Sequence, residues 1–247
     1  IPNWSMWLVL ELADYFKRTG DRATVDLLRP RVEGLVDFFA KLENEEGLLE
    51  NLPSWVFVEW SAANGYTAGV NYPSNMCWAR ALEEVADLYG RPELKAERMR
   101  ATIRRRSFDG TWFVDQAKRD KQGKLVEQKS ARTETCQYYA FYFGTATKET
   151  HPDLWKKLVT EFGPDRMKNF SSANLVSYMS RGAMRRNASI MSLYYPPYFV
   201  YMLLCALNGL KHPIFANLLK FPDQKKKIFE FARDLTKHDT LFDSLKR

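Results

Sequence analysis

Apolar residues recur at helical spacing through the first part of the chain. Residues 4–17 and residues 25–42 each place them at the i, i+3, i+4 and i+7 positions of one helical face. Between the two segments, Gly20 is a typical C-terminal residue of a helix and Asp21 a typical residue just before one. Pro30 is expected either to kink the second helix or to mark its first full turn. The pattern therefore predicts two helices joined as a hairpin.

Four more helices are expected further along the chain. Residues 74–89, which end before Gly90, and residues 92–106 form a second pair with a short connection. Residues 133–143 are apolar on most sides, so we expect that helix to be deeply buried. Residues 151–162 follow as an amphipathic helix. Repeated helical pairs separated by longer loops predict an all-α architecture.

Two stretches break the helical pattern. Residues 108–115 (FDGTWFVD) alternate around a turn signal and predict a short strand or a β-turn, and residues 124–127 predict a second strand. The stretch from Leu52 to Trp78 is too rich in Gly, Pro, Asn and Ser to form one helix. It nevertheless holds six aromatic residues and one acid, which are Trp55, Phe57, Trp60, Tyr66, Tyr72, Trp78 and Glu59. Because long loops are usually either functional or disordered, and disordered loops lack aromatics, we expect this one to be an ordered wall of a site.

Charge divides the chain near Arg166. The whole chain has a net charge of +7, but from Met167 onward there are 13 basic and 5 acidic residues, which leaves 24 basic and 25 acidic residues before that point. All seven tryptophans also precede Met167. We therefore expect residues 1–166 to form one domain and residues 167–247 to form a divergent basic tail.

Composition argues against several other classes of protein. No apolar run approaches the roughly 20 residues that a membrane helix needs. The three cysteines, Cys77, Cys136 and Cys205, form no CxxC motif and no cluster with the three histidines. We therefore expect reduced buried thiols, no metal site and no cofactor. No signal peptide is recognisable, and the compartment and oligomeric state are left open.

Six segments, taken together and in order, point to a family. They are IPNWSMWLVLELADYFKRTGD (1–21), SWVFVEWS (54–61), GVNYPSNMCWARALEEVADLYG (69–90), FDGTWFVD (108–115), ETCQYYAFYFG (134–144) and HPDLWKKLVTEFGPDR (151–166). Residues 1–166 thus resemble the catalytic domain of the bacterial α-L-rhamnosidases, which are six-hairpin glycosidases. No single segment is diagnostic; their order and spacing carry the resemblance.

The resemblance implies an all-α fold, here a partial (α/α)6 barrel of helical hairpins with a small β-hairpin insertion. It also implies inverting hydrolysis of terminal α-L-rhamnosyl bonds, which needs one carboxylic acid and one carboxylate. The family's Gly-Trp-x-Gly-Asp-like acid motif and its late Trp-Glu motif are not found in this sequence, so the catalytic residues are not assigned. We expect that the chain alone does not hydrolyse glycosides. The tail is then either a divergent end or a truncated or wrong-frame continuation of a longer gene.

The candidate substrate-binding residues come from positions where the family has aromatic or polar side chains around its sugar. They are Trp4, Trp55, Glu59, Trp60, Trp112 and Gln137, with Glu134 beside Gln137 as a further polar position. An indole can cover the apolar face of a pyranose, and a carboxylate can accept its hydroxyl groups. Each residue also has an ordinary interpretation: core packing for Trp4 and Trp60, a loop plug for Trp55, a salt-bridged acid for Glu59, a structural turn for Trp112 and a helix surface for Gln137.

Three functional hypotheses remain open. The first is a glycoside hydrolase fragment that acts on a rhamnose-containing glycan or glycoside. The second is a non-catalytic carbohydrate-binding or scaffolding α/α protein. The third is a nucleic-acid or anionic-surface binder, which rests on Lys225-Lys226-Lys227 and Arg185-Arg186. Because such runs are usually solvated and no nucleic-acid-binding fold is recognisable, we expect neither a nucleic-acid nor a membrane partner. Six-hairpin barrels act on many sugars, so the fold alone does not fix the substrate.

Overall fold

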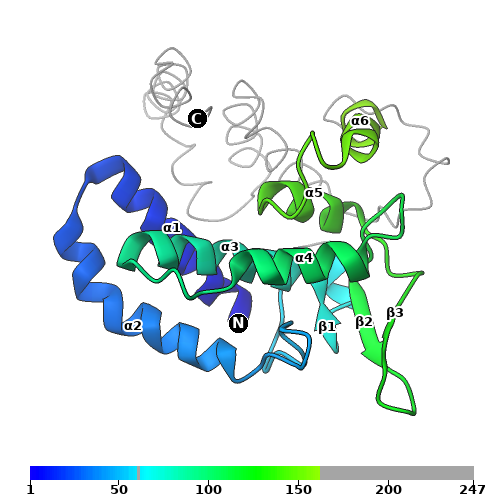
Figure 1. Cartoon of the computed structure of the whole chain (residues 1–247), viewed down its shortest axis with the longest axis horizontal. Helices are drawn as coiled ribbons and strands as arrows, with labels where there is room; N and C mark the ends of the chain where they lie inside the picture. Colours follow the sequence, from blue (N-terminus) through cyan, green and yellow to red (C-terminus); the bar gives the residue numbers. More distant parts are fainter. Residues whose placement is uncertain (60–61, 162–247) are drawn as a thin grey trace, which may run out of the picture. The chain divides into compact units, whose positions relative to one another are not determined.

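The computed structural model describes residues 1–59 and 62–161 (Figure 1). Trp60 and the predicted basic tail, with Cys205, lie outside the described residues. In chain order the elements are α1 (Pro2–Thr19), α2 (Arg22–Ala40), the short 3₁₀-helix η1 (Ala62–Gly65), β1 (Val70–Asn71), α3 (Tyr72–Tyr89), α4 (Ala96–Ser107), β2 (Gln116–Arg119), β3 (Leu125–Glu127), α5 (Glu134–Tyr142) and α6 (Pro152–Glu161). The helical class expected from the sequence is confirmed, with a small sheet beside the helices. The partial (α/α)6 barrel stays a prediction.

The predicted hairpin between α1 and α2 is confirmed at its junction. Gly20 has a φ of 68° and ends α1 in the left-handed conformation. The Asp21 carboxylate accepts a hydrogen bond from the Thr24 N–H and so caps the first turn of α2. Pro30 lies inside α2, which continues past it to Ala40. Short, correctly capped connections of this kind fix neighbouring helices antiparallel.

Helix α3 is the centre of the helical core. It packs against α1, α2, α4 and α5, and 14 of its 18 residues are buried. Figure 1 shows it beside α4, and α1 lies along it, from the Asn3–Ser74 hydrogen bond at its first turn to the Lys17–Glu84 ion pair further on. The helix begins at Tyr72, two residues earlier than predicted, because the Asn71 side chain caps it through the Ser74 N–H at 2.9 Å.

The three strands form one antiparallel sheet in the order β1-β2-β3. Val70 pairs with Ala117, and Ala117 pairs with Glu127. The strand predicted at 124–127 is confirmed as β3. Of the two alternatives predicted for residues 108–115, a strand or a β-turn, the structure has the turn, which is closed by an isolated bridge between Phe108 and Phe113. The Asp109 side chain stabilises this turn, because its Oδ1 accepts hydrogen bonds from the backbone N–H groups of Thr111 and Trp112.

Helix α5 is buried along nearly its whole length, as its all-round apolar character predicted. The Thr133 hydroxyl caps it by accepting from the Cys136 N–H at 3.2 Å. Within the described part of the chain, Cys77 and Cys136 are buried free thiols, as expected. None of the described helices is long and apolar enough to cross a membrane.

A buried amide on α3 fixes the loop that follows α2. The Asn75 Oδ1 accepts from the Leu49 N–H at 2.7 Å, and its Nδ2 donates to the Leu49 carbonyl at 3.0 Å. Leu49 and Asn75 are both 0% exposed, so water cannot replace these bonds. The side chain therefore pairs with both backbone groups of one residue, as a neighbouring strand would.

We expect Asn75→Ala to destabilise the fold by about 2–4 kcal/mol, because it leaves two buried backbone groups of Leu49 without partners. The free energy of unfolding in urea measures the change. Gln122→Ala is the control, since Gln122 is exposed in the β2–β3 turn and should change stability by less than about 0.5 kcal/mol. Equal stabilities of the Asn75 variant and the parent protein would contradict the role given to this amide.

Gly69 brings the chain against β2 immediately before β1. Its φ is 71°, and a Cβ atom added there would lie 2.5 Å from the Ala117 carbonyl oxygen. Gly34, by contrast, lies in α2 with open space around its missing Cβ and no positive φ. The two glycines therefore respond to the same substitution in opposite ways.

Gly69→Ala should destabilise the protein by about 2 kcal/mol or more, because strain and backbone overlap add. Gly34→Ala should stabilise it by about 0.5–1 kcal/mol through helix propensity. Thermal or chemical unfolding of the two variants tests this, and a Gly69→Ala protein as stable as the parent would show that β1 does not approach β2 this closely.

Candidate functional site

A buried polar network at the start of α3 positions the aromatic loop. The Asn71 Oδ1 accepts from the Ser74 hydroxyl at 2.5 Å, and its Nδ2 donates to the Tyr66 carbonyl at 2.9 Å. The Ser74 hydroxyl in turn accepts from the Asn3 Nδ2 at 2.8 Å, and the Asn3 Oδ1 accepts from the Phe57 N–H at 3.2 Å. Three segments far apart in sequence therefore meet here: the first turn of α1, the aromatic loop and the first turn of α3.

The next residues of the loop are held in the same manner. The Asn64 Oδ1 accepts from the Val58 and Glu59 N–H groups at 2.9 and 3.3 Å. From α5, the Tyr139 hydroxyl donates to the Val58 carbonyl at 2.7 Å. Side chains thus supply residues 57–59 with the hydrogen bonds that a neighbouring strand would make, and this part of the loop is ordered as the sequence predicted.

Two indoles emerge from these neighbouring segments into solvent. Trp4, on the first turn of α1, is 60% exposed, and Trp55 is 52% exposed and packs edge-on against Phe57 at 5.2 Å between ring centroids. The hydrogen bond from Phe57 to Asn3 ties the two segments together. Their exposure means that neither indole serves the core, which was the ordinary alternative for Trp4. Large exposed aromatics on an ordered backbone are typical of binding surfaces.

An open depression of about 730 Å³ lies along the N-terminal half of α1. It is lined by Ile1, Trp4, Ser5, Trp7, Leu8 and Glu11. Trp7 links the depression to α5. The Trp7 ring packs against the rings of Tyr142 and Phe143, with 5.9 and 5.5 Å between ring centroids, and the Trp7 side chain hydrogen-bonds Tyr139. The depression therefore has aromatic walls, with a carboxylate, that of Glu11, at its edge.

Glu59 is recessed below this surface. It is 8% exposed and lies close enough to the Tyr139 hydroxyl to influence its ionisation. Burial raises the pKa of Tyr139 well above its usual value, and Cys77 and Glu59 add to that shift. Tyr139 consequently stays protonated and acts as a hydrogen-bond donor. The structure thus brings Trp4, Trp55 and Glu59 into one region of the protein.

The other candidates belong to a second cluster, around Phe113. Gln137 is 0% exposed; its Oε1 accepts from the Phe113 N–H at 2.8 Å, and its Nε2 donates to the Phe113 and Thr133 carbonyls at 2.8 and 2.9 Å. Trp112 is 6% exposed, and the Lys157 ammonium lies 5.2 Å from its ring centroid. Gln137 therefore clamps the backbone as Asn75 does, and the sugar-binding roles of Gln137 and Trp112 stay predictions.

Two further acids are buried: Glu134, which the sequence analysis named as a polar position beside Gln137, and Asp115, which it did not single out. Glu134 is 0% exposed and accepts a short hydrogen bond from the Tyr138 hydroxyl. Asp115 is also 0% exposed, and its carboxylate accepts from the Thr133 hydroxyl and N–H at 2.6 and 2.7 Å. Burial raises the pKa of Asp115 to about 7, although the two bonds from Thr133 oppose the shift. Because Asp115 is sealed from solvent, it acts here as a support for the start of α5.

The residues that the structure describes hold no group of three or more His, Cys, Asp or Glu side chains suited to a metal ion. The candidate site residues therefore offer aromatic rings, side-chain amides in hydrogen-bond networks and single carboxylates. Such a surface suits a neutral, hydroxyl-bearing ligand with an apolar face.

Two solved rhamnosidases share this fold. A GH78 family rhamnosidase of Bacillus sp. GL1 aligns with a TM-score of 0.61 at 18% identity, over 89% of this chain and 22% of its own. A rhamnosidase from Klebsiella oxytoca with rhamnose bound aligns with a TM-score of 0.54 at 15% identity, over 92% of this chain and 39% of its own. Comparisons with protein-family models and with curated proteins found no match.

These structural alignments show that the chain has a fold similar to part of each of the two enzymes. The chain spans less than half the length of either enzyme.

The raised pKa of Asp115 predicts a pH-dependent stability. The folded protein retains the proton up to about pH 7, whereas the unfolded chain releases it near the ordinary value of about 4. Between these values the folded state binds more protons, so stability falls as the pH rises and levels off above about 7.

Asp115→Asn keeps an acceptor and a polar group beside Thr133 but cannot ionise. We expect it to be more stable than the parent above about pH 7, by up to a few kcal/mol, with the difference shrinking towards about pH 4. Urea unfolding of both proteins over this range measures it. Parallel pH profiles would show that Asp115 keeps an ordinary pKa in the folded state.

Proposed function

We propose that this chain is part of the helical catalytic domain of a glycoside hydrolase of the α-L-rhamnosidase type, and that it supplies part of the surface that binds the sugar. The substrate would be a rhamnose-containing glycan or glycoside. The observation that carries the proposal is the fold shared with two rhamnosidases over about nine tenths of this chain. It agrees with the resemblance found in six segments of residues 1–166.

The surface at the start of α1 supports the sugar-binding part of the proposal. Trp4 and Trp55 offer exposed indoles, which are suited to the apolar face of a pyranose and to the methyl group of rhamnose. Glu59, recessed beside Tyr139, is placed to accept hydroxyl groups that reach below the surface. The polar network through Asn3 fixes these elements before any ligand arrives, which lowers the entropy cost of binding.

In this proposal the described helices are consecutive hairpins of an (α/α)6 barrel, and residues 1–166 form the family-like part of the chain. Inverting hydrolysis needs two carboxyl groups about 6.5–9.5 Å apart. The two sequence motifs that would supply them are not found in this chain, and it spans 22% and 39% of the two enzymes. We therefore propose that the chain binds sugar but does not hydrolyse a glycoside by itself.

The missing motifs also favour a second function, a non-catalytic carbohydrate-binding or scaffolding α/α protein. Both functions use the same aromatic surface. They differ in whether activity returns when the chain is joined to segments that carry the two carboxylates.

We expect L-rhamnose to bind the purified chain weakly, with an affinity near the millimolar range. Trp4→Ala and Trp55→Ala should each weaken binding at least about fivefold, because each removes an exposed stacking surface. Glu59→Gln should weaken it less, since an amide oxygen still accepts hydroxyl donors. Ligand-observed NMR or calorimetry provides the affinities.

Phe38→Ala is the matched control, because Phe38 is an aromatic residue of α2 with 44% exposure. It should leave rhamnose binding unchanged. No turnover of an aryl α-L-rhamnoside is expected from the parent chain, so turnover that Glu59→Gln abolishes would overturn the view that the chain lacks its catalytic groups. Failure of rhamnose to bind, or equal effects of Phe38→Ala and Trp55→Ala, would overturn the proposed surface.

A further inference from the structure

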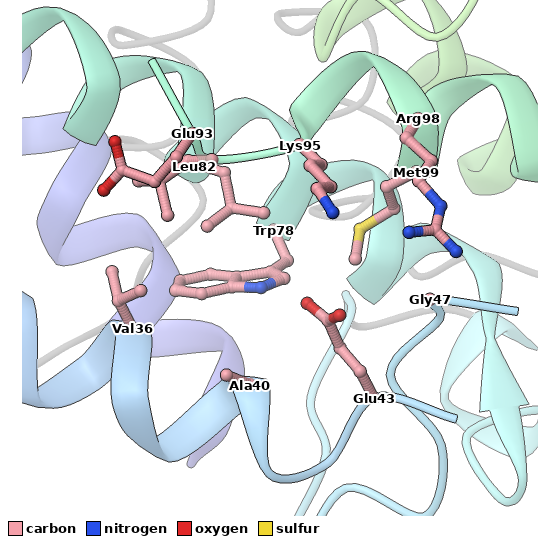
Figure 2. Close-up of a pocket in the computed structure, with 11 residues that line it drawn as sticks. Val36, Ala40, Glu43, Gly47, Trp78, Leu82, Glu93, Lys95, Arg98 and Met99 are labelled. Carbon is pink, nitrogen blue, oxygen red and sulfur yellow. The ribbon is translucent and has the colours of Figure 1, made fainter. Parts of the chain in front are cut away.

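A second pocket lies between α2, α3 and α4. It has a volume of about 180 Å³ and is shown in Figure 2. Its floor is formed by buried apolar side chains, those of Val36, Trp78, Leu82 and Met99. Its rim is charged, with Glu43 from the loop after α2 and Lys95 and Arg98 from the start of α4. None of the residues of the aromatic surface takes part in it, so the inference is independent of the proposed function.

A buried hydrogen-bond donor faces this pocket. Trp78 is 1% exposed, and its indole Nε1 is buried without a hydrogen-bond partner among the described residues. Figure 2 shows the nitrogen edge of the ring on the side of the Glu43 carboxyl group. Phe39 covers the ring from α2, with 4.4 Å between centroids, so the indole cannot turn away without disturbing the core. Buried donors without partners are rare in folded proteins, and a ligand that offers an acceptor would satisfy this one.

The rim groups are also available to a ligand. No ion pair joins Glu43 to Lys95 or Arg98 within the described residues. Partial burial raises the pKa of the Glu43 carboxyl group, and the two nearby cations oppose that shift. Glu93, the other acid at the pocket, is paired with Arg91 instead. One carboxylate and two cations therefore surround the polar end of the pocket.

We propose that this pocket binds a small aliphatic α-amino acid as its zwitterion. The ligand carboxylate accepts from the Trp78 indole and from Lys95 and Arg98, and its ammonium group donates to Glu43. The aliphatic side chain rests on Val36, Leu82 and Met99. A ligand of five or six carbons fits, since an engineered apolar cavity of about 150 Å³ accommodates benzene. Glu43 selects for the ammonium group, because an anion alone would meet its carboxylate.

The test is a titration of the whole chain with L-leucine, followed at the indole N–H resonances in heteronuclear NMR. The chain has seven tryptophans, so Trp78→Phe identifies the resonance of Trp78 by its loss, and the other indoles report whether that variant folds. Calorimetry on the parent chain gives the affinity without relying on this variant. L-leucine should shift the Trp78 resonance and leave that of the exposed Trp55 in place.

Three variants and two truncated ligands define the polar contacts. Glu43→Gln, Lys95→Met and Arg98→Met should each weaken L-leucine binding about tenfold, as expected for hydrogen bonds to charged groups. Glu93→Gln is the matched control, since Glu93 borders the pocket but pairs with Arg91, and it should change the affinity by less than about twofold. 4-Methylpentanoate is L-leucine without the ammonium group and isopentylamine is L-leucine without the carboxylate, so both should bind at least about tenfold more weakly.

Two results would overturn the proposal. The first is an unshifted Trp78 resonance, with no heat of binding, at about 10 mM L-leucine, which would mean an affinity too weak to be specific. The second is 4-methylpentanoate binding as tightly as L-leucine, with no effect of Glu43→Gln. That result would leave a site for simple carboxylates and remove the role assigned to Glu43.

Discussion

The buried polar network at the first turn of α3 is the constraint on which the described structure depends. Asn71, Ser74 and Asn75 lie within five consecutive residues, and all three are buried. Their side chains bond to backbone or side-chain groups of α1, of the loop after α2 and of the aromatic loop. A single helix terminus therefore organises one other helix and two irregular segments. Because the groups are sealed from water, breaking any one of these bonds exposes its partner to the full cost of an unsatisfied buried group.

The network explains how a long irregular loop holds the exposed Trp55 in a defined place. A backbone without a sheet ladder must find other partners for its N–H and C=O groups. Here the side chains of Asn3, Asn64 and Tyr139 supply them for residues 57–59. The aromatic side chains are then free to face outward, since the backbone does not need them for its own order. A backbone held by its own partners, with aromatic side chains at the surface, is what a rigid binding surface requires.

Trp78 shows how one core residue can serve two purposes. Its ring fills the space between α2 and α3, where it packs on Phe39. Its nitrogen edge borders the small pocket. Helix α4 and the charged side chains of Glu43, Lys95 and Arg98 complete that pocket. The apolar floor combines side chains of α2, α3 and α4, so the pocket exists only where these three helices meet. Helix packing thus creates both the core and the pocket beside it.

The sequence by itself determined the helical pairs, the Gly20–Asp21 junction, the burial of α5 and the order of the aromatic loop. These follow from hydrophobic spacing, capping residues and composition, which act over a few neighbouring positions. The tertiary structure alone decided that Gln137 and Asn75 clamp backbone groups 24 and 26 residues away, that Asp115 is sealed, and that residues 116–119 form the central strand. An amide or a carboxylate looks the same in sequence whether it meets water, a ligand or a distant backbone. Only packing removes the water, and burial then decides which partner each group must have.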